Sequence, residues 1–272
     1  MPELPEVETV LRGLRPYMQG EVLESVQQNR PNLRYAFPVG FVERLEGRRV
    51  VDMYRRAKYI IFDLDSDDQL ILHLGMSGHM QISLGNYQPK LHDHVVFRLS
   101  SGAVISYNDT RRFGFMDLWP KSKPYKAFSQ MGPEPFSSEF SATYLGQKFK
   151  EKHTPIKTAL LDQSVVAGLG NIYVCEVLFL AKIHPMTRCD QLDLPSLKTL
   201  VDHVRVVLKA AITAGGSTLR DHQKPDGEMG YFQHNFNVYG REHMPCITCL
   251  SPLWRSVQAG RSAFYCPVCQ KF

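Results

Sequence analysis

The spacing of apolar residues changes along the chain. Over residues 3–18 apolar side chains recur at intervals of three and four, which predicts an amphipathic helix. Residues 22–120 instead carry short β-rich runs separated by polar or glycine-containing turns. So many short strands at this spacing favour a β-sandwich or barrel. The strands are predicted at residues 50–54, 59–64, 70–74, 80–84, 95–99 and 104–107.

The chain after residue 120 is predicted to be mainly helical. Residues 121–138 are rich in proline, lysine and serine, which is typical of a linker. Residues 164–171 form a longer interval than the turn of an ordinary helix-turn-helix, and their two glycines permit a close backbone approach. Residues 217–233 are polar and are predicted to form a mobile loop. The helices are predicted at residues 141–150, 156–162, 172–180 and 196–214.

The composition is that of an ordinary globular protein. The chain has 272 residues, which is enough for two medium domains or one large one. No apolar run is long enough to span a membrane, and the N-terminus lacks the pattern of a signal peptide, so we expect a cytoplasmic protein. The net charge of +5 suggests a polyanionic partner without proving one.

Four of the six cysteines form two closely spaced pairs. Cys246-x2-Cys249 is followed after sixteen residues by Cys266-x2-Cys269, which is the spacing of a four-thiolate zinc site. Because thiolates fill all four coordination positions, we predict one structural Zn²⁺ per chain. The intervening residues fit a β-hairpin with Arg261 at its tip. That arginine is either a phosphate contact or an ordinary solvated side chain.

The N-terminus offers a second kind of chemistry. Removal of Met1 would leave Pro2 with a secondary amine, a good nucleophile toward carbon, and the carboxylates of Glu3 and Glu6 are close by in sequence. The alternative is that Pro2 only starts the helix, where proline is favoured because its missing N–H is not needed.

Eight sequence motifs follow one another along the chain. They are PELPEVET (residues 2–9), RRAKY (55–59), HLGMSG (73–78), HDHV (92–95), DTRRFG (109–114), MGPEP (131–135), GLGNIY (168–173) and the four-cysteine terminus with YCP (265–267). In this order they closely resemble the bacterial formamidopyrimidine-DNA glycosylases, and the resemblance covers essentially the whole chain. Leu4 and the Arg-Arg-Phe run favour this branch over the related endonuclease VIII branch, which typically has glycine in place of Leu4.

The resemblance implies an α+β multidomain fold. Its parts are an N-terminal β-sandwich that carries an N-terminal helix, a helix–two-turn–helix domain and a C-terminal four-cysteine zinc finger. We expect the catalytic domain over residues 1–132, the helical DNA-binding domain over 133–238 and the zinc-finger module over 239–272. The implied partner is damaged double-stranded DNA, bound by a monomer.

The resemblance also implies a function, that of a bifunctional DNA glycosylase and AP lyase of base-excision repair that removes oxidised purines. In the implied reaction the Pro2 amine attacks C1′, forms a Schiff base and cuts the strand by β,δ-elimination. Glu3 is the expected proton donor and acceptor, and Glu6 has a structural role near the nucleophile. Lys58 and Arg261 complete the implied catalytic set.

Further residues are implied to hold the DNA. The DNA-binding residues are His73, His92, Arg111, Asn171, Tyr239 and Lys157, and the residues that enter the emptied base stack are Met76, Arg111 and Phe113. An apolar wedge and an aromatic plane replace lost stacking, while a guanidinium can hydrogen-bond the widowed cytosine. The loop over residues 217–233 is expected to close over the oxidised purine.

Two other functions compete with this interpretation. One is a non-catalytic zinc-finger DNA-binding protein that keeps the scaffold, but the intact Pro2, Glu3 and Lys58 argue against it. The other is the oxidised-pyrimidine specificity of the endonuclease VIII type, against which Leu4 argues. The catalytic interpretation requires that Met1 is removed, because otherwise the Pro2 nitrogen is an unreactive amide.

Overall fold

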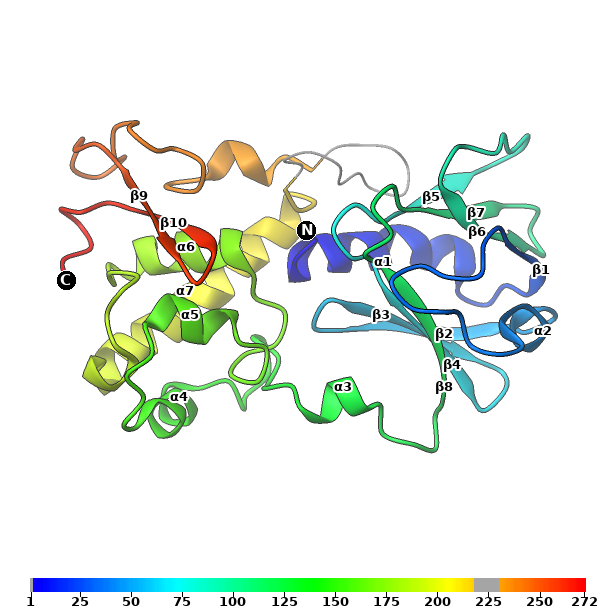
Figure 1. Ribbon diagram of the computed structural model, residues 1–272, viewed down its shortest axis with the longest axis horizontal. Helices are drawn as coiled ribbons and strands as arrows, with labels where there is room; N and C mark the ends of the chain where they lie inside the picture. The colour runs from blue at the N-terminus through cyan, green and yellow to red at the C-terminus, as the bar shows by residue number, and fades with distance from the viewer. Residues whose placement is uncertain (1, 218–229) are drawn as a thin grey trace. The chain divides into compact units, whose positions relative to one another are not determined.

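The chain forms two compact units in a computed structural model that describes residues 2–217 and 230–272 (Figure 1). The first unit comprises Met1–Ser129 and Ala214–Tyr231, and the second comprises Gln130–Thr213 and Phe232–Phe272. Among the described residues no helix is both long and apolar enough to cross a membrane.

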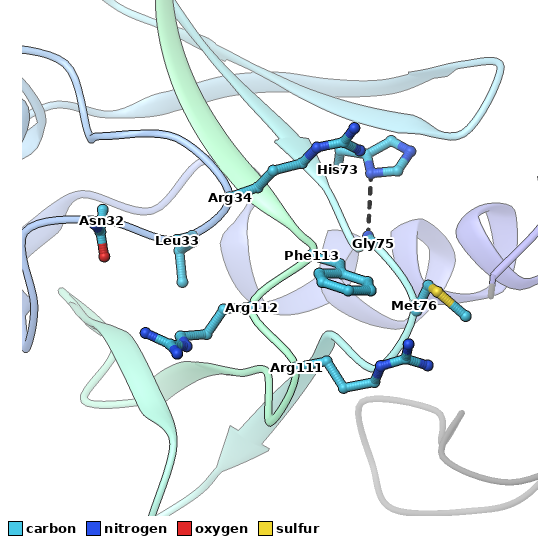
Figure 2. A pocket seen from close by; sticks show the side chains of 9 residues that line it. All are labelled: Asn32, Leu33, Arg34, His73, Gly75, Met76, Arg111, Arg112 and Phe113. Atoms are coloured by element: carbon cyan, nitrogen blue, oxygen red, sulfur yellow. Dashed lines mark hydrogen bonds between the residues drawn. The ribbon is translucent and has the colours of Figure 1, made fainter.

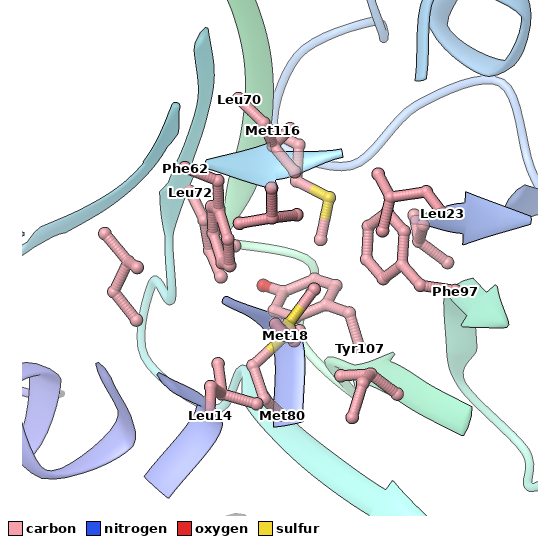
Figure 3. Close-up of a cluster of buried hydrophobic side chains, with 14 of the residues drawn as sticks. Leu14, Met18, Leu23, Phe62, Leu70, Leu72, Met80, Phe97, Tyr107 and Met116 are labelled. Atoms are coloured by element: carbon pink, nitrogen blue, oxygen red, sulfur yellow. The ribbon is translucent and has the colours of Figure 1, made fainter. Parts of the chain in front are cut away.

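The first unit contains two antiparallel four-stranded sheets. One has the order β1 (Leu23–Gln28), β6 (Asp93–Leu99), β7 (Val104–Asn108), β5 (His79–Ser83). The other has the order β2 (Val50–Arg56), β3 (Tyr59–Leu64), β4 (Asp68–His73), β8 (Phe115–Pro120). The inner side chains of both sheets share a single apolar core, so the sheets form the predicted sandwich (Figure 3).

The N-terminal helix α1 (Leu4–Met18) completes this core. Its apolar residues at three- and four-residue intervals are buried, as the sequence pattern predicts. Leu14 and Met18 lie among the core side chains of the sheets (Figure 3). Packing of α1 against the sandwich therefore fixes where the chain's first residues lie within the first unit. Two shorter helices belong to the same unit, namely α2 (Phe41–Leu45) and α3 (Lys126–Ser129).

The second unit is helical and ends in a hairpin. Its helices are α4 (Ala142–Phe149), α5 (Ile156–Leu161), α6 (Asn171–Leu180) and α7 (Leu194–Thr213), with short 3-10 turns at Cys189–Gln191 and Phe232–Asn235. Helix α6 is apolar around most of its circumference because it packs against α5, α7 and strand β10. Strands β9 (Trp254–Gln258) and β10 (Arg261–Tyr265) form the hairpin predicted between the cysteine pairs.

Most predicted elements appear within two residues of their expected bounds. Strands β1 and β8 were not predicted individually, although they lie in the region expected to be β-rich. The segment expected to be a linker contains the single-turn helix α3. The loop predicted over residues 217–233 falls largely on residues 218–229, which lie outside the described part of the chain.

Candidate nucleic-acid interface and metal centre

The N-terminus of α1 places two carboxylates inside the first unit. Pro2 is buried, and Glu3 and Glu6 are only 3 % and 2 % exposed. The backbone N–H of Glu3 donates to Glu6 Oε2 at 2.8 Å. The N–H and hydroxyl of Ser217 donate to Glu6 Oε1 at 2.8 and 3.0 Å. Glu6 thus ties the start of the helix to the segment that follows residue 213, while Met1 lies outside the described residues.

Two basic side chains lie close together in the second sheet, one in a turn and one at the end of a strand. Lys58 is buried in the two-residue turn between β2 and β3, where Ala57 has a φ of 52°. His73 ends β4, and its ring stacks on Phe115 with centroids 5.4 Å apart. The β3–β4 register pairs His73 with Tyr59, the residue after Lys58, so the fold brings these two predicted residues together.

The protonation state of His73 follows from its surroundings. Burial, reinforced by the positive charges of Lys58 and Arg34, lowers its pKa to about 4. The N–H of Gly75 donates to His73 Nδ1 at 3.1 Å, so this nitrogen acts as the acceptor. His73 is therefore neutral at pH 7 and offers its Nε2–H as a hydrogen-bond donor.

The three residues predicted to enter the base stack lie on two adjacent loops of the first unit. Met76 and Phe113 are 37 % and 43 % exposed, so they do not belong to the core. The guanidinium of Arg111 lies over the ring of Phe113, 4.7 Å from its centroid. In Figure 2 the Met76 side chain lies to the right of the Phe113 ring and that of Arg111 lies below it. We refer to Met76, Arg111 and Phe113 together as the wedge.

A cavity of about 640 Å³ adjoins the wedge (Figure 2). Besides the wedge it is lined by Asn32, Leu33, Arg34, His73, Gly75 and Arg112. Among these described lining residues there is no carboxylate, so the cavity carries a positive field that suits phosphate.

Arg34 and Arg112 were missed at the sequence level. Arg112 has a φ of 56°, which turns its side chain away from that of Arg111 and toward the opposite end of the cavity (Figure 2). Arg34 lies in the loop after β1, and its backbone N–H donates to Gly114 O at 3.1 Å. Two adjacent arginines in DTRRFG were the available signal for Arg112, whereas nothing local marked Arg34.

His92 directly precedes β6, an inner strand of the first sheet. It has a φ of 74°, and its carbonyl accepts the N–H of Asp109, which precedes the arginine pair of the wedge loop. Its ring lies 6.1 Å from that of His94. The fold therefore places His92 beside the base of the wedge loop.

The second unit gathers three of the predicted DNA-binding residues. Asn171 is the first residue of α6, and its Nδ2 donates to Ser262 O at 2.9 Å, next to Arg261. Lys157 on α5 is fully buried, and its pKa is lowered by burial and by the nearby Arg261. In the described part of the chain, Asn171 Oδ1 and Lys157 Nζ have no hydrogen-bond partner. Buried polar atoms of this kind are expected where a ligand completes the hydrogen bonds.

Tyr239 is held by a buried carboxylate of α6. Glu176, 1 % exposed, accepts the backbone N–H groups of Asn237, Val238 and Tyr239 at 2.8–3.0 Å. The Tyr239 ring packs edge-on against Phe264 of β10, with centroids 5.0 Å apart. Tyr239 is thereby fixed relative to the hairpin that carries Arg261.

The four paired cysteines come together at the base of the hairpin. Their sulfur atoms all lie within 4.8 Å of one another. The sulfur of Cys246 is 3.9 Å from that of Cys269, and that of Cys249 is 3.4 Å from that of Cys266. Four thiolates around a tetrahedral zinc ion, each at about 2.3 Å, lie about 3.8 Å apart. The cluster therefore fits a zinc ion in both donor type and spacing.

Known proteins match the chain along its full length. Residues 1–116 match the sequence profile of the formamidopyrimidine-DNA glycosylase N-terminal domain, and residues 131–223 match that of the H2TH domain of the same enzymes. A formamidopyrimidine-DNA glycosylase of Roseobacter denitrificans is 50% identical over 100% of both chains. The chain belongs to the formamidopyrimidine-DNA glycosylase family.

Solved structures of this family share the fold. The Lactococcus lactis Fpg in complex with an abasic site containing DNA superposes with a TM-score of 0.92, at 35% identity over 100% of both chains. The MutM (Fpg) protein of Thermus thermophilus gives a TM-score of 0.88, at 37% identity over 99% of this chain and 98% of that one. The predicted fold class and family are confirmed.

Proposed function

We propose that the chain is a DNA glycosylase and AP lyase of base-excision repair that acts on oxidised purines, 8-oxoguanine and formamidopyrimidines, in duplex DNA. One observation carries the proposal. The first unit contains both a buried N-terminus with two carboxylates and the exposed wedge. Membership of the formamidopyrimidine-DNA glycosylase family supports the same activity.

The wedge supplies the first step. A base inside a duplex is out of reach, so the damaged nucleotide must be extruded at a cost of roughly a few kcal/mol. Met76 and Phe113 fill the vacated stack, and Arg111 hydrogen-bonds the base that has lost its partner. The stacking of Arg111 on Phe113 orders both side chains before DNA binds, which lowers the entropy cost of insertion.

The N-terminus supplies the covalent chemistry. Once Met1 has been removed, the lone pair of the Pro2 amine attacks C1′, the C1′–N9 bond breaks and the base leaves with the bonding electrons and a proton. Glu3 protonates the ring oxygen, the sugar opens and a positively charged iminium forms. Loss of a C2′ proton then expels the 3′ phosphate, and loss of a C4′ proton in a second elimination expels the 5′ phosphate. Pro2 is released by hydrolysis of the final iminium.

Phosphates of the damaged strand need several donors. In the first unit we assign them to Lys58, His73 and His92, with His73 donating as a neutral ring. In the second unit we assign them to Asn171, Arg261, Tyr239 and Lys157. The N-terminus of α6, ten residues long, adds its backbone N–H groups beside Asn171.

The cysteine cluster has a structural role in this scheme. Cys246, Cys249, Cys266 and Cys269 would hold one Zn²⁺, which supplies folding energy to a module too small for a large core of its own. By fixing the β9–β10 hairpin, the cluster holds Arg261, the first residue of β10, directly after the two-residue turn.

Borohydride trapping tests the proposal. The processed protein is incubated with a duplex that carries 8-oxoguanine opposite cytosine, and sodium borohydride then reduces any iminium to a stable amine. We expect a covalent protein–DNA adduct and a cut strand with phosphates at both ends. A Pro2→Gly variant keeps an N-terminal amine as a weaker nucleophile, and an Asp65→Asn variant serves as the surface control. Processed protein that gives neither adduct nor free base would contradict the proposal.

A further inference from the structure

Asp109 lies at the junction of the two loops that carry the wedge. It follows β7, precedes Arg111 and Phe113 in sequence, and is 0 % exposed. Its Oδ1 accepts the Ser77 hydroxyl at 2.6 Å and the Arg111 N–H at 3.3 Å. Its Oδ2 accepts the Tyr107 hydroxyl at 3.1 Å and the Gly114 N–H at 2.9 Å. One buried carboxylate therefore bonds to both loops and to the sheet beneath them.

Ser77 closes the link between the loops. Its hydroxyl donates to Asp109 and accepts the N–H of Arg111 at 3.1 Å. Ser77 directly follows Met76. The backbone of Arg111 is therefore hydrogen-bonded to the residue next to Met76. Hydrogen bonds to an ionised carboxylate are roughly twice as strong as neutral ones, and burial strengthens them further.

Packing around this junction leaves the loops no space to shift. Gly75 has a φ of 71°, and a Cβ atom there would overlap the backbone of Gly114. A Cβ atom at Gly114 would overlap the hydroxyl of Tyr107. The two wedge loops thus touch backbone to backbone, directly above the group that hydrogen-bonds Asp109.

The neighbouring strand fixes Asp109 itself. The His94 Nε2–H on β6 donates to the Asp109 carbonyl at 2.8 Å, and burial lowers the pKa of His94 so that its ring is neutral at pH 7. Burial and the adjacent carboxylate raise the pKa of Tyr107 well above its usual value, so this side chain stays a donor. The described donors to the carboxylate are two hydroxyls and two backbone N–H groups, and none is a basic side chain. The basic residues that contact the junction are His94, His79, whose Nδ1 lies 3.3 Å from the Ser77 carbonyl, and Arg112, whose N–H donates to the Asp109 carbonyl at 3.3 Å.

We propose that Asp109 is a positioning residue that sets the spacing and orientation of the two wedge loops, and so controls extrusion of the damaged nucleotide. The inference rests on the proposed glycosylase function. Asp109 touches no reacting atom, so it acts through Met76, Arg111 and Phe113. The specific consequence is that its loss slows reactions that require extrusion from a paired stack, and spares reactions on a lesion that is already unpaired.

The test compares two substrates in single-turnover experiments with Asp109→Asn. One carries 8-oxoguanine paired with cytosine, and the other carries the same lesion inside an unpaired bulge. The N–H₂ group of the asparagine faces a backbone N–H and a hydroxyl, which are also donors, so the hydrogen bond from that backbone N–H is lost. We therefore expect base release from the paired substrate to slow by about 10-fold or more. Release from the bulge should change by less than about 3-fold, since extrusion costs little there.

Asp93→Asn is the matched control. Asp93 is also a buried carboxylate of the first sheet, and the donors described for it, Tyr87, Lys90 and Asn108 at 2.6–2.9 Å, all lie outside the wedge loops. It should lower the melting temperature in a similar way, yet leave the ratio of the two rates unchanged. Ser77→Ala removes the Ser77 hydrogen bonds to Asp109 and Arg111 and disturbs the structure less. It should also slow base release from the paired substrate relative to the bulge, even if Asp109→Asn folds poorly.

Fluorescence of 2-aminopurine beside the lesion gives a second readout. Its rise reports unstacking, and it should slow in Asp109→Asn by the same factor as base release from the paired substrate. If Asp109→Asn and Ser77→Ala slow both substrates equally, or neither, the inference is wrong while the glycosylase function stands. Wild-type protein that releases base from neither substrate would overturn the proposed function, and this inference with it.

Discussion

Replacement of Glu6 by glutamine probes how the N-terminus is held. The Glu6 carboxylate is 2 % exposed and accepts the Glu3 N–H, the Ser217 N–H and the Ser217 hydroxyl. In Glu6→Gln the new N–H₂ group must face one of two backbone N–H groups, whichever way the amide is turned. A buried donor left without an acceptor costs about 1–3 kcal/mol. The lost negative charge at the helix N-terminus adds about 0.3–1 kcal/mol.

The expected total is a loss of about 1.3–4 kcal/mol from the stability of the first unit. At about 2–4 °C per kcal/mol, its melting temperature should fall by roughly 3–16 °C. Differential scanning calorimetry measures this directly, with Glu24→Gln on an exposed position of β1 as the control. Borohydride trapping should weaken in the same variant, because the Pro2 amine is no longer held in place. A melting temperature within about 1 °C of wild type would refute the assigned role of Glu6.

Three further predictions follow from the basic residues and the cysteines. Arg34→Ala and Arg112→Ala should each reduce, by about 1, the magnitude of the slope of log association constant for duplex DNA against log salt concentration. Fluorescence anisotropy measures this slope. An unchanged slope would exclude a phosphate contact by that arginine. His73 is protonated in the unfolded chain below about pH 6.5 but stays neutral in the folded one down to about pH 4. The contribution of His73 to the free energy of unfolding is therefore complete above about pH 6.5. It is lost as the pH falls toward 4, by up to about 3 kcal/mol. The free energy of unfolding of His73→Gln, measured by urea titration, should lack this decline. Chelation of the metal should unfold the hairpin and abolish duplex binding without melting the sandwich, and metal content far below one zinc per chain would contradict the assignment.

Local patterns predicted the elements and the chemistry that depend on neighbours in sequence. The helical spacing of Leu4, Val7 and Leu11 was enough to place α1, because a single apolar face decides whether it packs. The cysteine spacing was enough to predict a four-sulfur cluster, since two knuckles joined by a hairpin bring the pairs together. The order of motifs, rather than any single motif, indicated the family.

Contacts between distant residues could not be predicted in this way. The bond from Ser217 to Glu6 joins residues 211 positions apart, and no pattern around either residue indicates it. Asp109 gathers donors from residue 77 and from residues 107–114, and its role depends on the antiparallel β5–β7 pairing that brings these loops together. Arg34 lies in an irregular loop whose position is set by a backbone bond to Gly114. The contacts of Asp109 and Arg34 depend on how the strands and loops are arranged in the sandwich, which apolar spacing does not specify.

The location of the trapped adduct tests the central claim most directly. After borohydride reduction with 8-oxoguanine DNA, the protein is digested and the modified peptide is sequenced by mass spectrometry. Our account predicts that Met1 is absent and that the reduced sugar is attached to the nitrogen of Pro2. An adduct on an internal lysine such as Lys58 or Lys157, with Pro2 unmodified, would contradict it.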